Sequence, residues 1–171
     1  KINDMKTIKK LFLTLALVLV SSAAFAQKTS HALGFHAGGS SFDLEYRYYM
    51  DNSRFLDFTL GAFDFDKGFV ISGTYNKVFQ EWDHWTPNFA TWKLWGGLGA
   101  TLGVWDSGAQ EAKNQFMVGP TGVLGFGFTV NELPLTVGLD YRPSVLMTFG
   151  NGFDIVGAGF RNFGITLTYQ F

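Results

Sequence analysis

Six charged residues fall at alternate positions of segments that read as β-strands, and they are the residues best placed to do chemistry together. They are three acids and three bases: Glu45, Asp57, Asp140, Arg47, Lys93 and Arg142. Because side chains alternate between the two faces of a strand, all six are expected on one face. Charges enclosed in a narrow space should be paired, since an isolated buried charge is costly. The pattern therefore predicts a lumen ion-pair network, with a proton or ion path as the alternative use of the same residues.

Other kinds of chemistry have little support. Ser40 and Ser41 lie near His36 and are the only candidates for a nucleophile with a base, but Ser-Ser beside Gly-Gly is typical of a turn. The acids and histidine of residues 81–84 are metal ligands by type, yet no second ligand cluster accompanies them. We therefore predict that the chain is not an enzyme and has no catalytic residues, cofactor or metal.

The element that must position these charges is clearest at the C-terminus, in the stretch Phe160 to Phe171. Counting back in twos from Phe171 gives aromatic and aliphatic residues, and the intervening positions are threonine, glycine, glutamine and asparagine. This alternation is the period of a β-strand with one apolar and one polar face. A tilted strand of roughly 9–11 residues spans a bilayer, so the stretch is long enough to do so. We predict that it is the closing strand of a membrane barrel.

Seven further strands are predicted upstream of this one. Their ranges are 31–38, 42–50, 55–64, 69–79, 92–105, 116–130 and 135–147. The total of eight is an even number, as a single-chain bacterial barrel requires. Because Pro120 cannot donate to a ladder, we expect a bulge or the outer end of the sixth strand there. The fold class is thus all-β, an eight-stranded antiparallel up-and-down transmembrane β-barrel.

The N-terminal segment has the three parts of a secretory signal peptide. Lys6, Lys9 and Lys10 precede a short apolar run, and small residues end it at Ala24 and Ala26. Residues 1–26 are therefore predicted to be upstream residues and a cleaved signal peptide, and residues 27–171 the barrel domain. The apolar run is too short for a membrane helix, so only a closed barrel would place the exported chain in a membrane.

Composition narrows the function further. Of 13 Lys and Arg and 14 Asp and Glu residues, four bases and one acid lie in 1–26, so 9 basic and 13 acidic residues remain, which argues against nucleic acid as a partner. The absence of cysteine excludes disulfides and thiolate metal sites. The 21 glycines and 18% aromatic residues suit a small barrel with tight curvature and interfacial aromatic girdles.

Several stretches resemble the small outer-membrane β-barrel proteins of the Bacteroides group, which are porin-like or opacity-protein-like. They are A-L-G-F-H-A-G-G-S-S-F-D-L-E-Y, S-G-T-Y-N-K-V-F, W-G-G-L-G-A and, most specifically, L-D-Y-R-P at 139–143. The resemblance implies insertion by the outer-membrane assembly machinery, which reads a terminal aromatic signal matched here by Tyr169 and Phe171. It implies no reaction, and it matches Asp140 and Arg142 to a conspicuous inward pair.

We therefore expect a monomeric protein of the bacterial outer membrane, with a structural or surface-interaction role and a plugged, ion-paired lumen. Its expected partners are outer-membrane lipid and the assembly machinery. A narrow channel for small solutes is one alternative. A soluble lipocalin-like binding barrel is the other, but such a barrel should carry its charges outward. An aromatic girdle of Tyr46, Tyr48, Tyr141 and Tyr169 favours lipid.

Overall fold

The computed structural model describes residues 30–64, 67–84, 89–106, 115–149 and 154–171. The predicted signal peptide at 1–26 lies outside this part of the chain. The described residues are almost entirely β-strand, and the only other regular element is a short 3₁₀ helix. No helix among them has the length and apolar character needed to cross a membrane.

Ten strand segments and the 3₁₀ helix η2 make up the described part of the fold. Their bounds are β1 His31–Gly38, β2 Ser41–Tyr49, β3 Arg54–Phe63, β4 Gly68–Trp82, β5 Ala90–Trp105, β6 Gln115–Val130, β7 Leu135–Tyr141, β8 Leu146–Phe149, β9 Asp154–Val156, η2 Gly157–Arg161 and β10 Phe163–Gln170.

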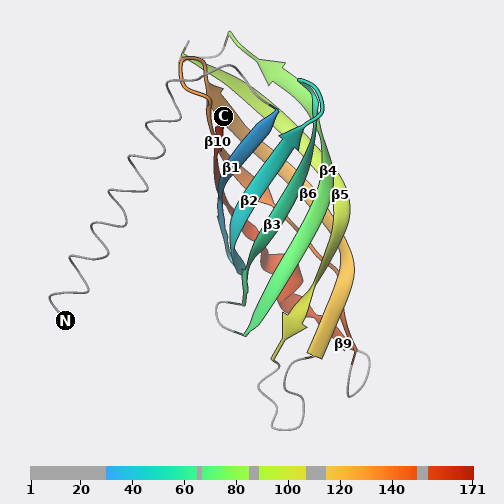
Figure 1. The fold of residues 1–171 in the computed structure, drawn as a ribbon. Helices are drawn as coiled ribbons and strands as arrows, with labels where there is room; N and C mark the ends of the chain where they lie inside the picture. The colour runs from blue at the N-terminus through green and yellow to red at the C-terminus, as the bar shows by residue number, and fades with distance from the viewer. Residues whose placement is uncertain (1–29, 65–66, 85–88, 107–114, 150–153) are drawn as a thin grey trace, which may run out of the picture.

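These segments occupy eight positions around a closed barrel. Neighbours from β1 to β7 pair antiparallel in chain order, and β10 pairs with both β7 and β1 to close the ring (Figure 1). β7 and β8 pair with successive parts of β6 and so share one position. β9 pairs with β8 and shares the last position with β10. The predicted all-β, eight-stranded, up-and-down antiparallel barrel is confirmed.

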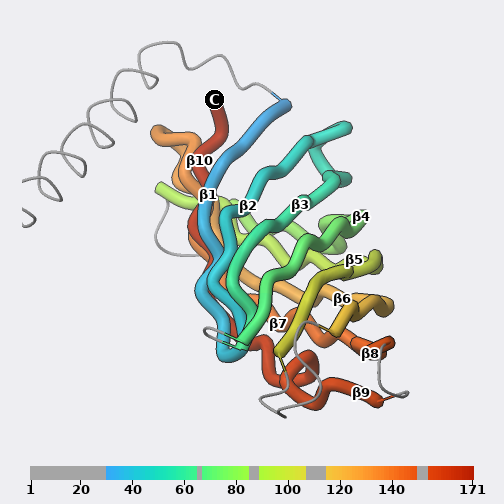
Figure 2. Tube along the Cα trace, turned by 60° about the horizontal axis from the view of Figure 1, so that its bottom comes forward, coloured from blue at the N-terminus to red at the C-terminus, as the bar shows by residue number. Residues whose placement is uncertain are grey.

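The chain has both described ends at one end of the barrel, here called the terminal end. Figure 1 shows β1 in blue beside β10 in red, with the C-terminus at the top. The tube in Figure 2 follows the strands around from β1 to β6, with β8 and β9 at the opposite end, here called the distal end. The predicted polar turns at 51–54 and 131–134 both connect strands at the terminal end.

The closing strand shows how the sequence sorts side chains between the two faces of the wall. Phe163, Ile165 and Leu167 are 60%, 55% and 44% exposed, whereas Thr166 and Thr168 are 0% and 1% exposed. The same alternation runs through β1, β2 and β3, with large apolar side chains outside and polar side chains inside. The barrel is thus apolar on its exposed surface and largely polar in its interior, the reverse of a soluble barrel.

The position shared by β7 and β8 corrects the expected strand boundaries. The seventh strand was predicted as one run to residue 147, but β7 ends at Tyr141 and β8 begins at Leu146. The bulge or strand end expected at Pro120 is not found, because β6 continues through Pro120 in register with β5 and the break lies in the neighbouring strand. The Pro120 carbonyl accepts a hydrogen bond from the Val145 N–H at 3.0 Å. In an antiparallel ladder the N–H and C=O of one residue point to the same neighbouring strand. The N–H that Pro120 lacks would therefore point to the break between β7 and β8, and its absence costs β5 no hydrogen bond.

Two further boundaries differ from expectation. Residues 160–161 belong to η2, so the closing strand begins at Phe163 and not at Phe160. The connection expected at 80–91 is shorter, because β4 runs to Trp82 and β5 starts at Ala90. The ladder between these two strands shifts register at Val78 and Gln80, which marks a β-bulge in β4.

Candidate functional site

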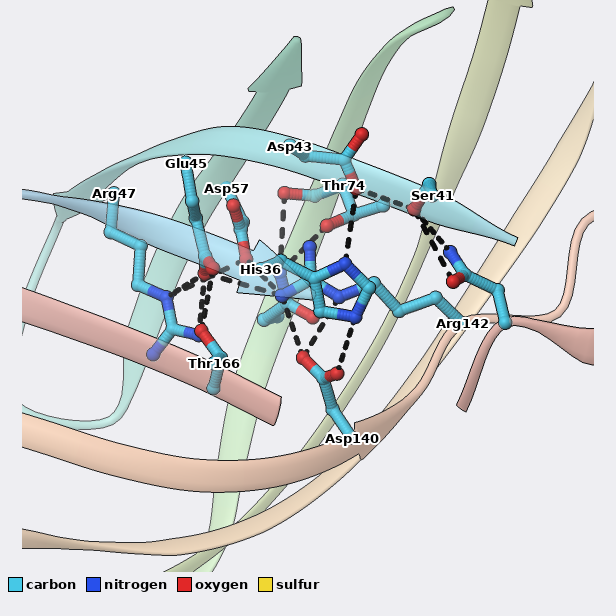
Figure 3. Close-up of polar contacts among 12 residues, drawn as sticks. His36, Ser41, Asp43, Glu45, Arg47, Asp57, Thr74, Asp140, Arg142 and Thr166 are labelled. Carbon is cyan, nitrogen blue, oxygen red and sulfur yellow. Dashed lines mark hydrogen bonds and ion pairs between the residues drawn. The ribbon is translucent and has the colours of Figure 1, made fainter. Parts of the chain in front are cut away.

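A cluster of buried charged residues crosses the middle of the lumen, and we call it the plug. It consists of His36 from β1, Asp43, Glu45 and Arg47 from β2, Asp57 from β3, and Asp140 and Arg142 from and just after β7 (Figure 3). Each of these residues is at most 6% exposed. Alternation along β2 directs its three members to one side, and the β2–β3 register sets Arg47 directly opposite Asp57.

Arg47 forms the terminal side of the plug. Its Nη2 lies 2.6 Å from Glu45 Oε1, and its Nε donates to the same oxygen at 2.6 Å. Thr166 of β10 donates to the other Glu45 oxygen at 2.5 Å. The Arg47 guanidinium also lies over two rings, 5.0 Å from the centroid of Phe55 and 5.5 Å from that of Trp95. Ion pairing together with these two ring contacts holds this group in one orientation.

Arg142 links the carboxylates of three different strands. Its Nε and Nη2 donate to Asp140 Oδ2 at 2.8 and 2.6 Å. Nη2 also donates to Glu45 Oε1 at 3.2 Å and lies 3.5 Å from Asp57 Oδ2. Glu45 is therefore shared by both arginines. Because β2 and β7 lie on different sides of the closing strand, Arg142 ties the wall together across the lumen.

His36 extends the plug toward the distal end, and sequence reasoning did not include it or Asp43 in the network. Its Nδ1 lies 3.0 Å from Asp43 Oδ2, and its Nε2 lies 3.0 Å from Asp140 Oδ1. The signal that could have revealed this pairing is the tight hairpin between β1 and β2, whose register puts His36 opposite Asp43. With a carboxylate facing each ring nitrogen, the arrangement suits an imidazolium with both nitrogens protonated.

Lys93 does not join the other predicted residues. It lies near the terminal end of β5 and pairs instead with Glu81 at 3.3 Å, where both side chains are partly exposed. The structure thus brings together five of the six predicted residues and adds His36 and Asp43. The plug holds four carboxyl groups, two guanidinium groups and one imidazole, so the expected balance of three acids and three bases does not hold.

The lumen is also closed on the distal side by an apolar layer. Its members are Phe63, Val70, Met117, Leu146, Val156 and Ala158, with Trp105 packed against them. A cavity of about 20 Å³, room for about one water molecule, lies between this layer and the plug. A second cavity of about 140 Å³ opens on the terminal side, lined by Tyr49, Lys93 and Gln170 among others. The plug separates the two cavities.

Most residues considered for catalysis and metal binding have other partners, whereas the buried Ser40 Oγ has no hydrogen-bond partner among the described residues. Ser41 donates to Asp43 Oδ2 at 2.6 Å, and both ring nitrogens of His36 face carboxylates. In the turn after β4, His84 lies 3.4 Å from Asp83 in a highly exposed pair. Across the described ranges, no group of three or more His, Asp or Glu side chains is arranged to hold a metal ion.

The two residues of the predicted terminal signal lie at the seam between the first and last strands. The Phe171 N–H donates to the His31 carbonyl at 3.0 Å, and the two rings stack with centroids 6.4 Å apart. Tyr169 pairs with Leu33 across the seam. Of the proposed girdle, Tyr141 lies elsewhere, because its hydroxyl donates to the Phe160 carbonyl at 3.0 Å beside η2.

Fold and site together define a small eight-stranded antiparallel β-barrel with a filled, ion-paired lumen. No family model, curated protein or solved structure matches the chain.

Proposed function

We propose that this protein is an outer-membrane β-barrel with a structural or surface-interaction role and a closed lumen. The observation that carries the proposal is the inverted distribution of side chains. Large apolar residues on the outer face of every long strand are about half exposed, among them Phe35, Leu44, Phe58, Ile71 and Leu102, while charges and hydroxyls fill the interior. So much exposed apolar surface is unfavourable in water and favourable in lipid.

The dimensions of the barrel agree with this proposal. The strands β2 and β3 contain 9 and 10 residues, which is about the length that spans a bilayer when tilted. Among the described residues, strand pairing around the whole ring leaves no long open edge, and a membrane barrel needs that closure because lipid cannot satisfy backbone polar groups. The predicted signal peptide supplies the route of export, and the resemblance of the terminal aromatics to an assembly signal supplies the route of insertion.

The filled lumen supports a role other than transport. An ion-paired layer and an apolar layer lie in series along the axis, and the larger cavity reaches only one side of the plug. An eight-stranded barrel has an interior just wide enough for side chains, so these layers occupy the space that a pore would need. We therefore favour a function exercised by the barrel as an anchor or by its surface.

The first test is the behaviour of the full chain expressed with its own N-terminal segment. Recovery in the outer-membrane fraction, with a mobility difference between cold and boiled samples on a gel, is the expected result. Recovery as a soluble periplasmic protein would contradict the proposal and favour a lipocalin-like barrel. Steady conductance in planar bilayers would instead revive the narrow channel.

A substitution on the outer face makes the test quantitative. Leu167→Arg places a charge in the middle of β10 on the outer face, where Leu167 is 44% exposed. In lipid this should lower the free energy of unfolding by about 2–4 kcal/mol. In a soluble barrel the same exposed change should alter it by about 0.5 kcal/mol or less. Urea unfolding in lipid vesicles therefore separates the two environments.

A further inference from the structure

Counting the charges of the plug shows that it lacks one positive charge. Four carboxyl groups, those of Asp43, Glu45, Asp57 and Asp140, face two arginines and one histidine. Even with His36 counted as an imidazolium, one negative charge remains uncompensated. An unpaired charge in a closed interior is strongly unfavourable, so an additional positive charge is required.

Asp57 is the carboxyl group that the protein satisfies least. Glu45 accepts from Arg47, Arg142 and Thr166, and Asp140 accepts two hydrogen bonds from Arg142. By contrast, neither oxygen of Asp57 has a hydrogen-bond donor among the described residues, although the side chain is 1% exposed. Its nearest cationic groups are Arg47 Nε and Arg142 Nη2, both at 3.5 Å.

The surroundings of Asp57 offer a place for the missing charge. Asp57 lines the 20 Å³ cavity together with Asp43, whose Oδ1 also has no hydrogen-bond donor among the described side chains. The remaining lining is rich in hydroxyl groups, including those of Thr59 and Thr74. The carboxyl groups of Asp57 and Glu45 are neighbours, because Arg142 Nη2 lies 3.5 Å from Asp57 Oδ2 and 3.2 Å from Glu45 Oε1. Two carboxyl groups approach each other favourably only when a proton or a cation lies between or beside them.

We propose that Asp57 binds one monovalent cation, either a proton or Na⁺, which completes the charge balance of the plug. A proton would reside on the carboxyl group itself and be donated toward Glu45. Na⁺ would occupy the cavity with oxygen ligands from Asp57, Asp43 and the neighbouring hydroxyls, the ligand type that hard cations prefer. This inference concerns the lumen alone and does not depend on the proposed membrane location.

The test compares Asp57→Asn with Asp140→Asn in the refolded full chain. An amide resembles a neutral carboxylic acid, so Asp57→Asn should leave the urea midpoint unchanged or raise it. Asp140→Asn should lower the midpoint, because it weakens two short bonds to Arg142. A loss in Asp57→Asn as large as that in Asp140→Asn would overturn the proposal, since Asp57 would then be an ordinary ionised partner of the arginines.

Changes in the solution conditions distinguish Na⁺ from a proton as the bound cation. If the cation is Na⁺, replacing Na⁺ by choline at constant ionic strength should lower the midpoint of the parent protein but not that of Asp57→Asn. If it is a proton, Na⁺ should have no effect. The folded state then holds a proton that the unfolded chain releases, so stability should fall as the pH rises from the ordinary carboxyl pKa of about 3.9 to the higher pH at which folded Asp57 ionises. The fall should be steeper in the parent than in Asp57→Asn, whose remaining slope comes from other groups such as His36. A parent protein that responds to Na⁺ and to pH in the same way as Asp57→Asn would overturn the proposal.

A measurement on the unmodified protein tests the proposal even if one of the variants does not fold. Infrared spectra of the folded parent should contain the C=O band of a protonated carboxyl group at neutral pH if the charge is a proton. If that band is absent and Na⁺ has no effect on the midpoint, Asp57 carries no extra charge and the proposal fails.

Discussion

Replacing Arg142 by methionine should sharply destabilise the barrel. Methionine keeps much of the length of the side chain but removes its charge and all its donors. Asp140 would lose two hydrogen bonds of 2.6–2.8 Å and Glu45 one of 3.2 Å, and both carboxylates are almost fully buried. Removing one partner of a buried ion pair costs about 3–5 kcal/mol, because the remaining charge is left without compensation. Here two carboxylates share that loss.

The assay is urea unfolding of the refolded barrel, followed by tryptophan fluorescence and by the gel mobility shift. With an m-value of about 2 kcal/mol/M, the expected loss corresponds to a midpoint lower by about 1.5–2.5 M. Arg54→Met is the matched control, because Arg54 pairs with Asp51 in an exposed turn. Its midpoint should match that of the parent, since exposed ion pairs contribute little.

Adding Asp140→Asn to Arg142→Met should recover part of the loss, because the double variant removes one of the carboxylates left unpaired. The two residues are in direct contact, so their effects should be non-additive by about 0.5–3 kcal/mol. An Arg142→Met midpoint equal to that of the Arg54 control would refute the reasoning. The lumen charges would then be solvated, and the barrel would hold a wet passage and not a plug.

Two further predictions concern lumen packing and the polar turn. Gly125→Val should lower the free energy of unfolding by about 1–3 kcal/mol, because a side chain there would overlap the Trp95 indole. Gly73→Ala is the control, because a Cβ atom there would make only an ordinary contact. The urea midpoints of the two variants are compared. In the turn, the hydrogen bond from Arg54 lowers the pKa of Asp51 to about 2. NMR titration in detergent should find that value and a return toward the ordinary value of about 3.9 in Arg54→Met. The small stabilisation from this exposed hydrogen bond is therefore present above the ordinary pKa of Asp51 and lost as the pH falls toward 2. An unshifted pKa of Asp51 would show that the hydrogen bond in the turn does not form.

The fold was predictable because a barrel wall imposes a period of two on every strand. The alternation of β10 could be counted directly, and it gave the correct face for Leu167 and Thr166 alike. The same alternation predicted that Glu45, Arg47 and Asp140 face inward. Strand breaks were harder to predict: the interruption after Tyr141 contains Pro143, which has no N–H to donate, and it lies beside Pro120 of the neighbouring strand.

The alternation of the strands was not sufficient to predict which residues form the plug. A period of two gives the face of a residue but not its height along the axis, so Lys93 was grouped with charges that lie further inside the barrel. His36 and Asp43 required the register of the hairpin, which brings them together from two strands. The pairing of Arg142 with Asp140 and Glu45 followed from charge and face alone.

Glycine has a second role in this barrel that its abundance did not reveal. The high glycine content suggested curvature, yet several glycines on the inner face lie directly beside the largest lumen side chains. A Cβ atom at Gly164 would lie 2.7 Å from His36 Nε2, and one at Gly138 would lie 2.5 Å from the Trp95 ring. Both distances are too short for real contacts, so the wall needs glycine there to admit these rings. In an eight-stranded barrel the strand count limits the interior volume, and glycines at these inward positions leave the space that the large lumen side chains occupy.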